Sequence, residues 1–113
     1  MRESGILMPV SSLPGPYGIG CFGKKAEKFV DFLAAAGQKI WQILPLSPTG
    51  YGDSPYQSCS AFAGNPYFVD LEALEKEGLL TAADLKAESW GKDPLEVDYG
   101  TLYVSRFAVL RKA

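Results

Sequence analysis

The chain has 113 residues, 47% of them hydrophobic, with 11 basic and 13 acidic side chains and a formal net charge of −2. This composition is typical of a globular chain, and the slight acidic excess argues against nucleic acid as a partner, because such a surface needs clustered positive charge. The absence of histidine excludes a histidine general base and most zinc sites from these residues, so no metal is expected here.

Residues 5–45 predict one βαβ unit. A short apolar run at residues 5–8 indicates a buried strand, a second run at residues 40–44 indicates another, and a proline follows each. Between them, a helix is predicted from about Lys24 to a stop at Gly37. Its apolar residues follow helical spacing: Ala26, Phe29, Val30, Leu33 and Ala36. This order of elements favours parallel pairing of the two strands.

Residues 46–67 are expected to form a long loop, because they are rich in Gly, Ser, Pro and Tyr. Loops of this length within a domain are usually functional. Residues 68–113 predict a helical insertion. Asp70 can cap a helix that Gly78 ends, and the run Thr81-Ala82-Ala83-Asp84 resembles a capping box. A last helix follows from the spacing of Tyr99, Tyr103, Phe107 and Leu110.

The final helix carries no stop signal, and a parallel sheet needs more than two strands with cover on both faces. We therefore expect a piece of a larger α/β domain; the alternative is an unusual small α/β domain complete in itself. No run approaches the roughly 18 apolar residues of a membrane span, and no signal-peptide core is present. We expect a cytoplasmic chain with no membrane partner.

Two cysteines, Cys21 and Cys59, form no CxxC pair. We expect two buried free thiols, as in a reducing compartment, although the sequence leaves a disulfide between them open. The tight basic cluster of Lys24, Lys25 and Lys28 is expected to be a solvated helix face rather than a binding patch.

Residues 18–23 match the GxGxxG pattern of dinucleotide-binding folds. That site needs its first glycine directly after a strand, whereas here nine residues with three prolines intervene. No acidic residue follows the next predicted strand until Asp53. We therefore do not expect a nicotinamide or flavin cofactor.

Residues 51–58, Tyr-Gly-Asp-Ser-Pro-Tyr-Gln-Ser, follow the C-terminal end of the second predicted strand, where folds with parallel strands place their sites. Aromatic faces stack on a sugar ring, and short polar side chains bond to its hydroxyl groups. The candidate sugar contacts are Tyr51, Asp53, Ser54, Tyr56 and Gln57. The alternative is a rigid surface loop whose tyrosines pack locally.

Two further patterns carry less chemistry. Tyr99 and Tyr103 share a helix face, and spacing alone favours core packing for them. No pair of carboxylates forms an evident acid/base couple, since nothing in the sequence brings Asp53 and Asp70 to the separation of about 5 Å that retaining glycoside chemistry requires.

Three stretches in register resemble the amylomaltase family, the 4-alpha-glucanotransferases of the glycoside hydrolase family 77 type. They are residues 11–20, 41–50 and 51–67. The resemblance is strong from about Ser4 to Leu80 and continues more weakly to the end. It implies that the βαβ unit opens a (β/α)₈ TIM barrel, of which this chain is the N-terminal portion and incomplete as a barrel.

The resemblance also implies an activity. Such enzymes move a segment of an α-1,4-glucan to the 4-hydroxyl of an acceptor glucan or glucose, with retention and without a cofactor. Their nucleophile and acid/base would lie beyond residue 113, so no catalytic residue is assigned here. Tyr56 and Ser54 match donor-site contacts, and Asp53 and Gln57 match supports of the loop. Tyr51 and Tyr103 match a possible secondary glucan site.

The chain departs from the family pattern at two places. Met8-Pro9-Val10 stands where many relatives have His-Pro-Thr, and Cys59 replaces an aromatic residue.

Two alternative functions stay open. They are a hydrolase of the same α-amylase-like superfamily and a non-catalytic maltodextrin-binding fragment. The partners implied are an α-1,4-glucan or maltooligosaccharide and the rest of the catalytic barrel. The isolated chain is expected to be inactive.

Overall fold

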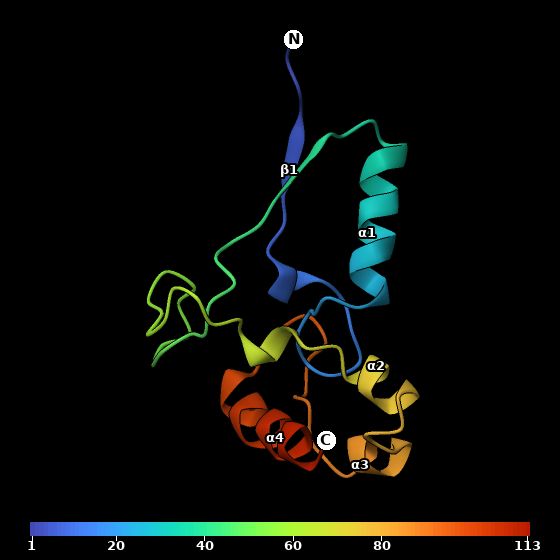
Figure 1. Cartoon of the computed structure of the whole chain (residues 1–113), viewed down its shortest axis with the longest axis vertical. Helices are drawn as coiled ribbons and strands as arrows, with labels where there is room; N and C mark the ends of the chain where they lie inside the picture. The colour runs from blue at the N-terminus through green and yellow to red at the C-terminus, as the bar shows by residue number, and fades with distance from the viewer.

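Two short parallel strands, β1 (Gly5–Leu7) and β2 (Ile40–Gln42), pair in register with Gly5 opposite Ile40. The computed structural model describes all 113 residues. The strands are joined by α1 (Lys24–Ala35), which runs alongside them (Figure 1). The predicted strand–helix–strand order and the parallel pairing are confirmed. Gly37 ends the connection after α1 with a φ of 75°, a value that glycine adopts without strain.

The strands are largely exposed, so the prediction of a buried strand at residues 5–8 is wrong for this chain. Leu7 is 55% exposed and Ile40 is 49% exposed. The sheet has only two strands, and α1 covers one side of it, where the Phe29 and Trp41 rings meet edge to face with centroids 5.1 Å apart. Burial of a parallel strand requires neighbours on both edges and both faces, which these residues do not supply.

The loop between β1 and α1 folds back on itself and builds most of the core beneath α1. It contains the short helix η1 (Val10–Ser12). Val10 and Leu13 are buried against Ala26 of α1. The Trp41 indole donates a hydrogen bond to the Met8 carbonyl at 2.9 Å, which ties the end of β1 to β2.

A second part of the molecule is helical and lies at the end away from the N-terminus (Figure 1). Its helices are η2 (Pro66–Phe68), α2 (Leu71–Lys76), α3 (Ala82–Lys86) and α4 (Tyr99–Lys112). Two small cores join them. One contains Leu71, Leu80, Leu85 and Val109, and the other contains Ile19, Tyr67 and Leu102. No helix has both the length and the apolarity that crossing a bilayer would require.

The local signals at the ends of these helices are confirmed. Asp70 caps α2 by accepting a hydrogen bond from the Glu72 amide at 3.1 Å, and Gly78 follows α2 with a positive φ. Thr81 and Asp84 form the capping box of α3, with reciprocal bonds of 2.9 and 3.2 Å. Each of these interactions joins residues at most three positions apart, so the sequence alone specifies it.

The face of α4 that packs inward differs from the predicted one. The fully buried residues of α4 are Leu102, Ser105, Arg106 and Val109. Tyr103 is 68% exposed, so the expectation that it packs in the core is wrong, whereas Tyr99 is half-buried. The predicted face is defined by the aromatic residues Tyr99, Tyr103 and Phe107, whereas the observed buried face is centred on Leu102, Arg106 and Val109.

Candidate functional site

The loop that follows β2 closes into a turn that carries most of the candidate sugar contacts. Thr49 and Ser58 form an isolated antiparallel bridge across its base. At its tip, the Asp53 amide donates to the Gly50 carbonyl at 3.1 Å, and the Gln57 amide donates to the Ser54 carbonyl at 3.2 Å. The turn is therefore built by short-range hydrogen bonds, and it projects from the rest of the molecule (Figure 1).

Asp53 has the only positive φ among the non-glycine residues of the chain, 58°. Aspartate tolerates this left-handed conformation better than most residues, because its short side chain bonds to nearby polar groups. Here the Thr49 hydroxyl donates to the Asp53 carboxylate at 3.4 Å. Strained backbone of this kind is concentrated at functional sites, where the surroundings hold it in place.

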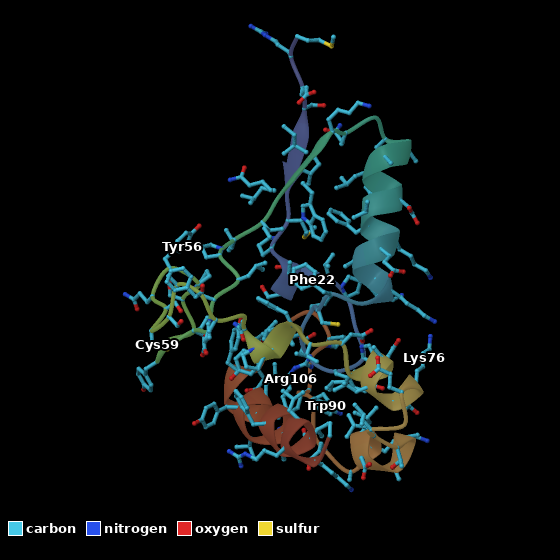
Figure 2. All side chains as sticks on the ribbon, in the orientation of Figure 1. Phe22, Tyr56, Cys59, Lys76, Trp90 and Arg106 are labelled. Carbon is cyan, nitrogen blue, oxygen red and sulfur yellow. The ribbon has the colours of Figure 1, made fainter.

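Tyr56 stands on this turn with its ring in solvent. Its side chain is 72% exposed, and its amide donates to the Ser54 hydroxyl at 3.3 Å. Figure 2 shows Tyr56 and Cys59 on the projecting loop, away from the packed helices around Arg106. Gln57 is also exposed, while Ser54 is half-buried. The open ring with polar groups beside it is an arrangement that can stack on a sugar.

A groove of about 890 Å³ lies between the same loop and the start of α4. Tyr51 and Asp53 line it from the loop, and Tyr103 lines it from α4. Beneath Tyr103, the Phe107 ring lies 5.5 Å away and in turn contacts the Tyr67 ring at 5.7 Å. The structure thus brings Tyr51, Asp53 and Tyr103 together, while Ser54, Tyr56 and Gln57 do not line this groove.

Two of the four tyrosines that line the groove, Tyr67 and Tyr99, have raised pKa values, so their phenols stay protonated at neutral pH. Burial raises the pKa of Tyr67, and the Asp53 carboxylate raises it further. Burial and Asp53 also raise the pKa of Tyr99, against a smaller opposing effect of a hydrogen bond with Ser11. Neutral phenols both donate and accept hydrogen bonds, as contact with sugar hydroxyls requires.

Two residues of this region lie outside the sequence predictions. Asn65 is buried. Its side-chain oxygen accepts from the Tyr67 backbone amide at 2.9 Å, and its backbone amide donates to the Leu46 carbonyl at 2.8 Å. The Asn-Pro pair at a helix start is a capping signal that could have identified it. Arg106 is buried in the middle of α4, and no local pattern distinguishes it from a solvent-facing arginine.

Both cysteines are free thiols, in agreement with the expectation, but they are not both buried. Cys59 is exposed on the projecting loop, and Cys21 is half-buried. The Cys21 thiol lies 3.8 Å from the Asp70 carboxylate; burial raises its pKa and the Asp70 charge adds to that effect. Cys59 falls in the most exposed stretch of the loop, where no core residue covers it.

The glycines of the GxGxxG stretch serve close packing. A β carbon on Gly18 would lie 2.3 Å from the Trp90 carbonyl, and one on Gly23 would lie 2.8 Å from the Asp70 carboxylate. The first turn of α1 therefore faces a carboxylate of this chain. Lys24, at the start of α1, is exposed like the rest of the lysine cluster, as expected for a solvated helix face. Nowhere in the chain do three His, Cys, Asp or Glu side chains come together as potential metal ligands.

Comparison with known proteins gives a consistent result. A family model described as 4-alpha-glucanotransferase matches residues 8–113. The chain is 58% identical over 112 residues to a 4-alpha-glucanotransferase of Streptococcus pneumoniae, covering 99% of this chain and 22% of that protein. It is 50% identical over 112 residues to a 4-alpha-glucanotransferase of Thermus thermophilus, covering 99% of this chain and 21% of that protein.

A solved structure shares the fold. It is an amylomaltase from Streptococcus agalactiae in complex with acarbose, with a TM-score of 0.94 and 52% identity, covering 99% of this chain and 23% of that one. The chain thus spans about a fifth of the length of the relatives it matches. The matched residues include the β1–α1 loop, the turn that carries Tyr56 and the α4 helix. The chain therefore belongs to the 4-alpha-glucanotransferase family.

Proposed function

We propose that this chain forms the N-terminal part of a 4-alpha-glucanotransferase with a (β/α)₈ barrel. Residues 5–45 would supply the first βαβ unit, residues 46–67 the substrate-site loop and residues 68–113 a helical insertion. The observation that carries the proposal is the family match over residues 8–113. The parallel pairing of β1 and β2 across α1 is the connection that such a barrel repeats.

The proposed reaction moves a segment of an α-1,4-glucan to the 4-hydroxyl of an acceptor glucan or glucose. In the retaining mechanism, a carboxylate attacks the anomeric carbon while a carboxylic acid protonates the leaving oxygen, and the acceptor hydroxyl then displaces the enzyme. We assign neither role to Asp53 or Asp70, because the Asp53 carboxylate accepts from Thr49 within its turn and the Asp70 carboxylate caps α2. Both catalytic groups would come from residues outside this chain.

The role we assign to these residues is to form one wall of the glucan site. The Tyr56 ring would stack beside the sugar that is cleaved, because it is open to solvent and fixed through its backbone to Ser54. Ser54, Asp53 and Gln57 would contact sugar hydroxyls or hold the turn. Tyr51 and Tyr103, which face one groove, would hold a more distant part of the glucan. The structural relative binds acarbose, which supports an α-glucan as ligand.

The experiment is to incubate the whole polypeptide that carries residues 1–113 with maltotriose and follow both products and reducing ends. A transferase releases glucose and accumulates longer maltooligosaccharides while the number of reducing ends stays constant. A hydrolase raises that number with every bond cut. Constant reducing ends with glucose release support the proposal, a steady rise supports the hydrolase, and unchanged maltotriose overturns both.

A second function rests on the groove itself. Because Tyr51 and Tyr103 are both strongly exposed and line one groove, a non-catalytic maltodextrin-binding fragment is the alternative for this chain alone. Titration calorimetry of the isolated chain with maltoheptaose tests it. Saturable heat that Tyr103→Ala abolishes favours the binding fragment, and the absence of heat together with a non-cooperative thermal melt excludes it.

A further inference from the structure

Arg106 is an unusual buried residue. It lies in the middle of α4 and is 1% exposed, which puts it among the three most deeply buried large side chains together with Leu71 and Leu102. Burying a guanidinium is costly unless its charge and its donors find partners. Burial lowers its pKa, and the neighbouring Cys21 and Asp70 act in the opposite direction. Because an aliphatic side chain could be buried here without this cost, the burial of Arg106 indicates a function that requires its guanidinium group.

The hydrogen bond of Arg106 reaches 37 residues back along the chain. Its Nη2 atom donates to the backbone carbonyl of Val69, and its Nε atom has no hydrogen-bond partner. Val69 directly follows η2 and precedes Asp70, the cap of α2. The guanidinium therefore joins α4 to the segment of residues 65–70.

That segment is the junction between the substrate-site loop and the rest of the molecule. Asn65 donates to the Leu46 carbonyl at the start of the loop, and the Phe68 carbonyl accepts from Phe22 of the β1–α1 loop at 3.1 Å. The Tyr67 ring lies 5.8 Å from the Tyr99 ring of α4. Movement of this segment against α4 would therefore change the groove that lies between the loop and α4.

Most other contacts of α4 are apolar, and its other charged contact, between Lys112 and Asp84 of α3, lies at the opposite end of the helix from Tyr99 and Tyr103. Leu102 and Val109 pack in apolar clusters, and apolar packing is not directional, so it resists separation of the helix more than sliding or rotation. A hydrogen bond between a charged group and one chosen carbonyl is directional, and buried polar groups of this kind can specify one arrangement. Tyr103, which lines the groove, stands one turn before Arg106 on α4.

We propose that Arg106 is a positioning residue that sets the Tyr51–Tyr103 groove for long glucan chains by fixing α4 to Val69. The inference rests on the proposed glucanotransferase function. Arg106 touches no substrate; it acts through α4 and through the segment of residues 65–70. A short donor that reaches only the Tyr56 side of the loop does not depend on it, whereas a long donor that also occupies the groove does.

The test compares maltotriose with a long linear maltodextrin as donors for the whole polypeptide. Arg106→Met removes the charge and the donors, and Arg111→Met is the matched control on an exposed position of the same helix. For Arg106→Met, KM for the long donor rises about tenfold or more, the scale of losing one hydrogen bond to a charged group, while kcat/KM for maltotriose stays within about twofold. Arg111→Met changes neither, and Arg106→Lys recovers part of the loss.

The outcomes separate the inference from simple destabilisation and from the proposed function. If Arg106→Met lowers kcat/KM equally for both donors, or for neither of them, the positioning role is overturned. If Arg106→Met does not fold, Arg106→Lys decides: a long-to-short KM ratio raised by about twofold or more supports the role, and an unchanged ratio overturns it. A wild-type polypeptide that does not act on maltotriose at all refutes the proposed function instead, before any variant is compared.

Discussion

Gly20 lies directly against the backbone of Val10. A β carbon on Gly20 would stand 1.9 Å from the Val10 carbonyl oxygen and 2.7 Å from the Leu13 amide nitrogen. The Gly20 amide donates to the Ser11 carbonyl at 3.0 Å, so the β1–α1 loop closes on itself at this point. The same loop buries Val10 and Leu13 beneath α1 and Ile19 against Tyr67 and Leu102, which makes its closure a condition for two of the cores.

Gly20→Ala is therefore expected to destabilise the whole polypeptide by about 2–3 kcal/mol, because the added methyl must displace backbone atoms rather than a flexible side chain. The free energy of unfolding in urea measures it. Gly64→Ala is the matched control, since a β carbon there meets no atom within 4 Å and the backbone has no positive φ. Equal stability of the two variants would show that the loop opens at little cost.

Several elements of the fold could be predicted from the sequence because they depend on neighbouring residues. The βαβ order follows from a change of hydrophobic period, and the caps at Asp70 and Thr81 join residues at most three positions apart. The turn at residues 51–58 could be assigned to a loop from its glycine and its proline. In each case the determining interaction lies within one element or its ends.

The failures concern features that distant contacts determine. The exposed strands depend on the absence of neighbours on both sides of the sheet, and the exposure of Tyr103 depends on how α4 rotates against η2 and α2. Arg106 is buried because a carbonyl 37 residues earlier accepts its hydrogen bond. Asp53 lines the groove with Tyr51 and Tyr103, whereas the family resemblance groups it with Tyr56. Local patterns carry none of this information.

Asp53 is expected to be replaceable by Asn but not by Ala. Asn adopts the left-handed backbone readily and keeps a side-chain oxygen for the Thr49 hydroxyl, whereas Ala loses that bond and pays about 1 kcal/mol for the positive φ. We expect Asp53→Ala to raise KM for maltotriose about three- to tenfold, because Tyr56 is misplaced. We expect the KM of Asp53→Asn to stay near the wild-type value. Equal effects of both substitutions would instead assign the role to the negative charge.

The capping box of α3 predicts a pH-dependent stability. Hydrogen bonding with Lys112 and then with Thr81 lowers the pKa of Asp84 to about 2. A lowered pKa stabilises the folded state in full above the ordinary value of about 4, and this contribution disappears as the pH falls through about 2.

Asp84→Asn is therefore expected to lower the Tm at pH 7 and to converge with wild type near pH 2. Thermal melts at the two pH values measure it, with Asp31→Asn at an exposed position of α1 as the control. Salt at 1 M should reduce the difference in Tm at pH 7, because the Lys112 side chain of the pair is 63% exposed to solvent. A difference in Tm between wild type and Asp84→Asn that stays constant from pH 7 to pH 2 would contradict a role for the carboxylate charge.

The two thiols are expected to differ in reactivity. Cys59 is exposed, whereas Cys21 is half-buried, and burial and Asp70 raise its pKa, which reduces its thiolate fraction. A disulfide reagent at pH 8 should modify Cys59 faster by on the order of 10-fold or more. In Cys59→Ser, one equivalent of the fast phase should disappear. A fast phase that persists in that variant and disappears in Cys21→Ser would reverse the assignment.

Tyr56→Ala is expected to lower kcat/KM for transfer from maltotriose by roughly 10-fold or more, since a stacked aromatic ring contributes about 1–3 kcal/mol through contact and positioning. Tyr56→Phe is the control. The Tyr56 backbone amide, which donates to the Ser54 hydroxyl, is present in both variants, so the turn keeps its hydrogen bond. Because the ring is 72% exposed, its removal leaves no cavity, and the Tm should stay unchanged. If kcat/KM falls in Tyr56→Ala but not in Tyr56→Phe, the effect belongs to the face of the ring. Loss in both assigns it to the hydroxyl, and unchanged kinetics in both would remove Tyr56 from the site.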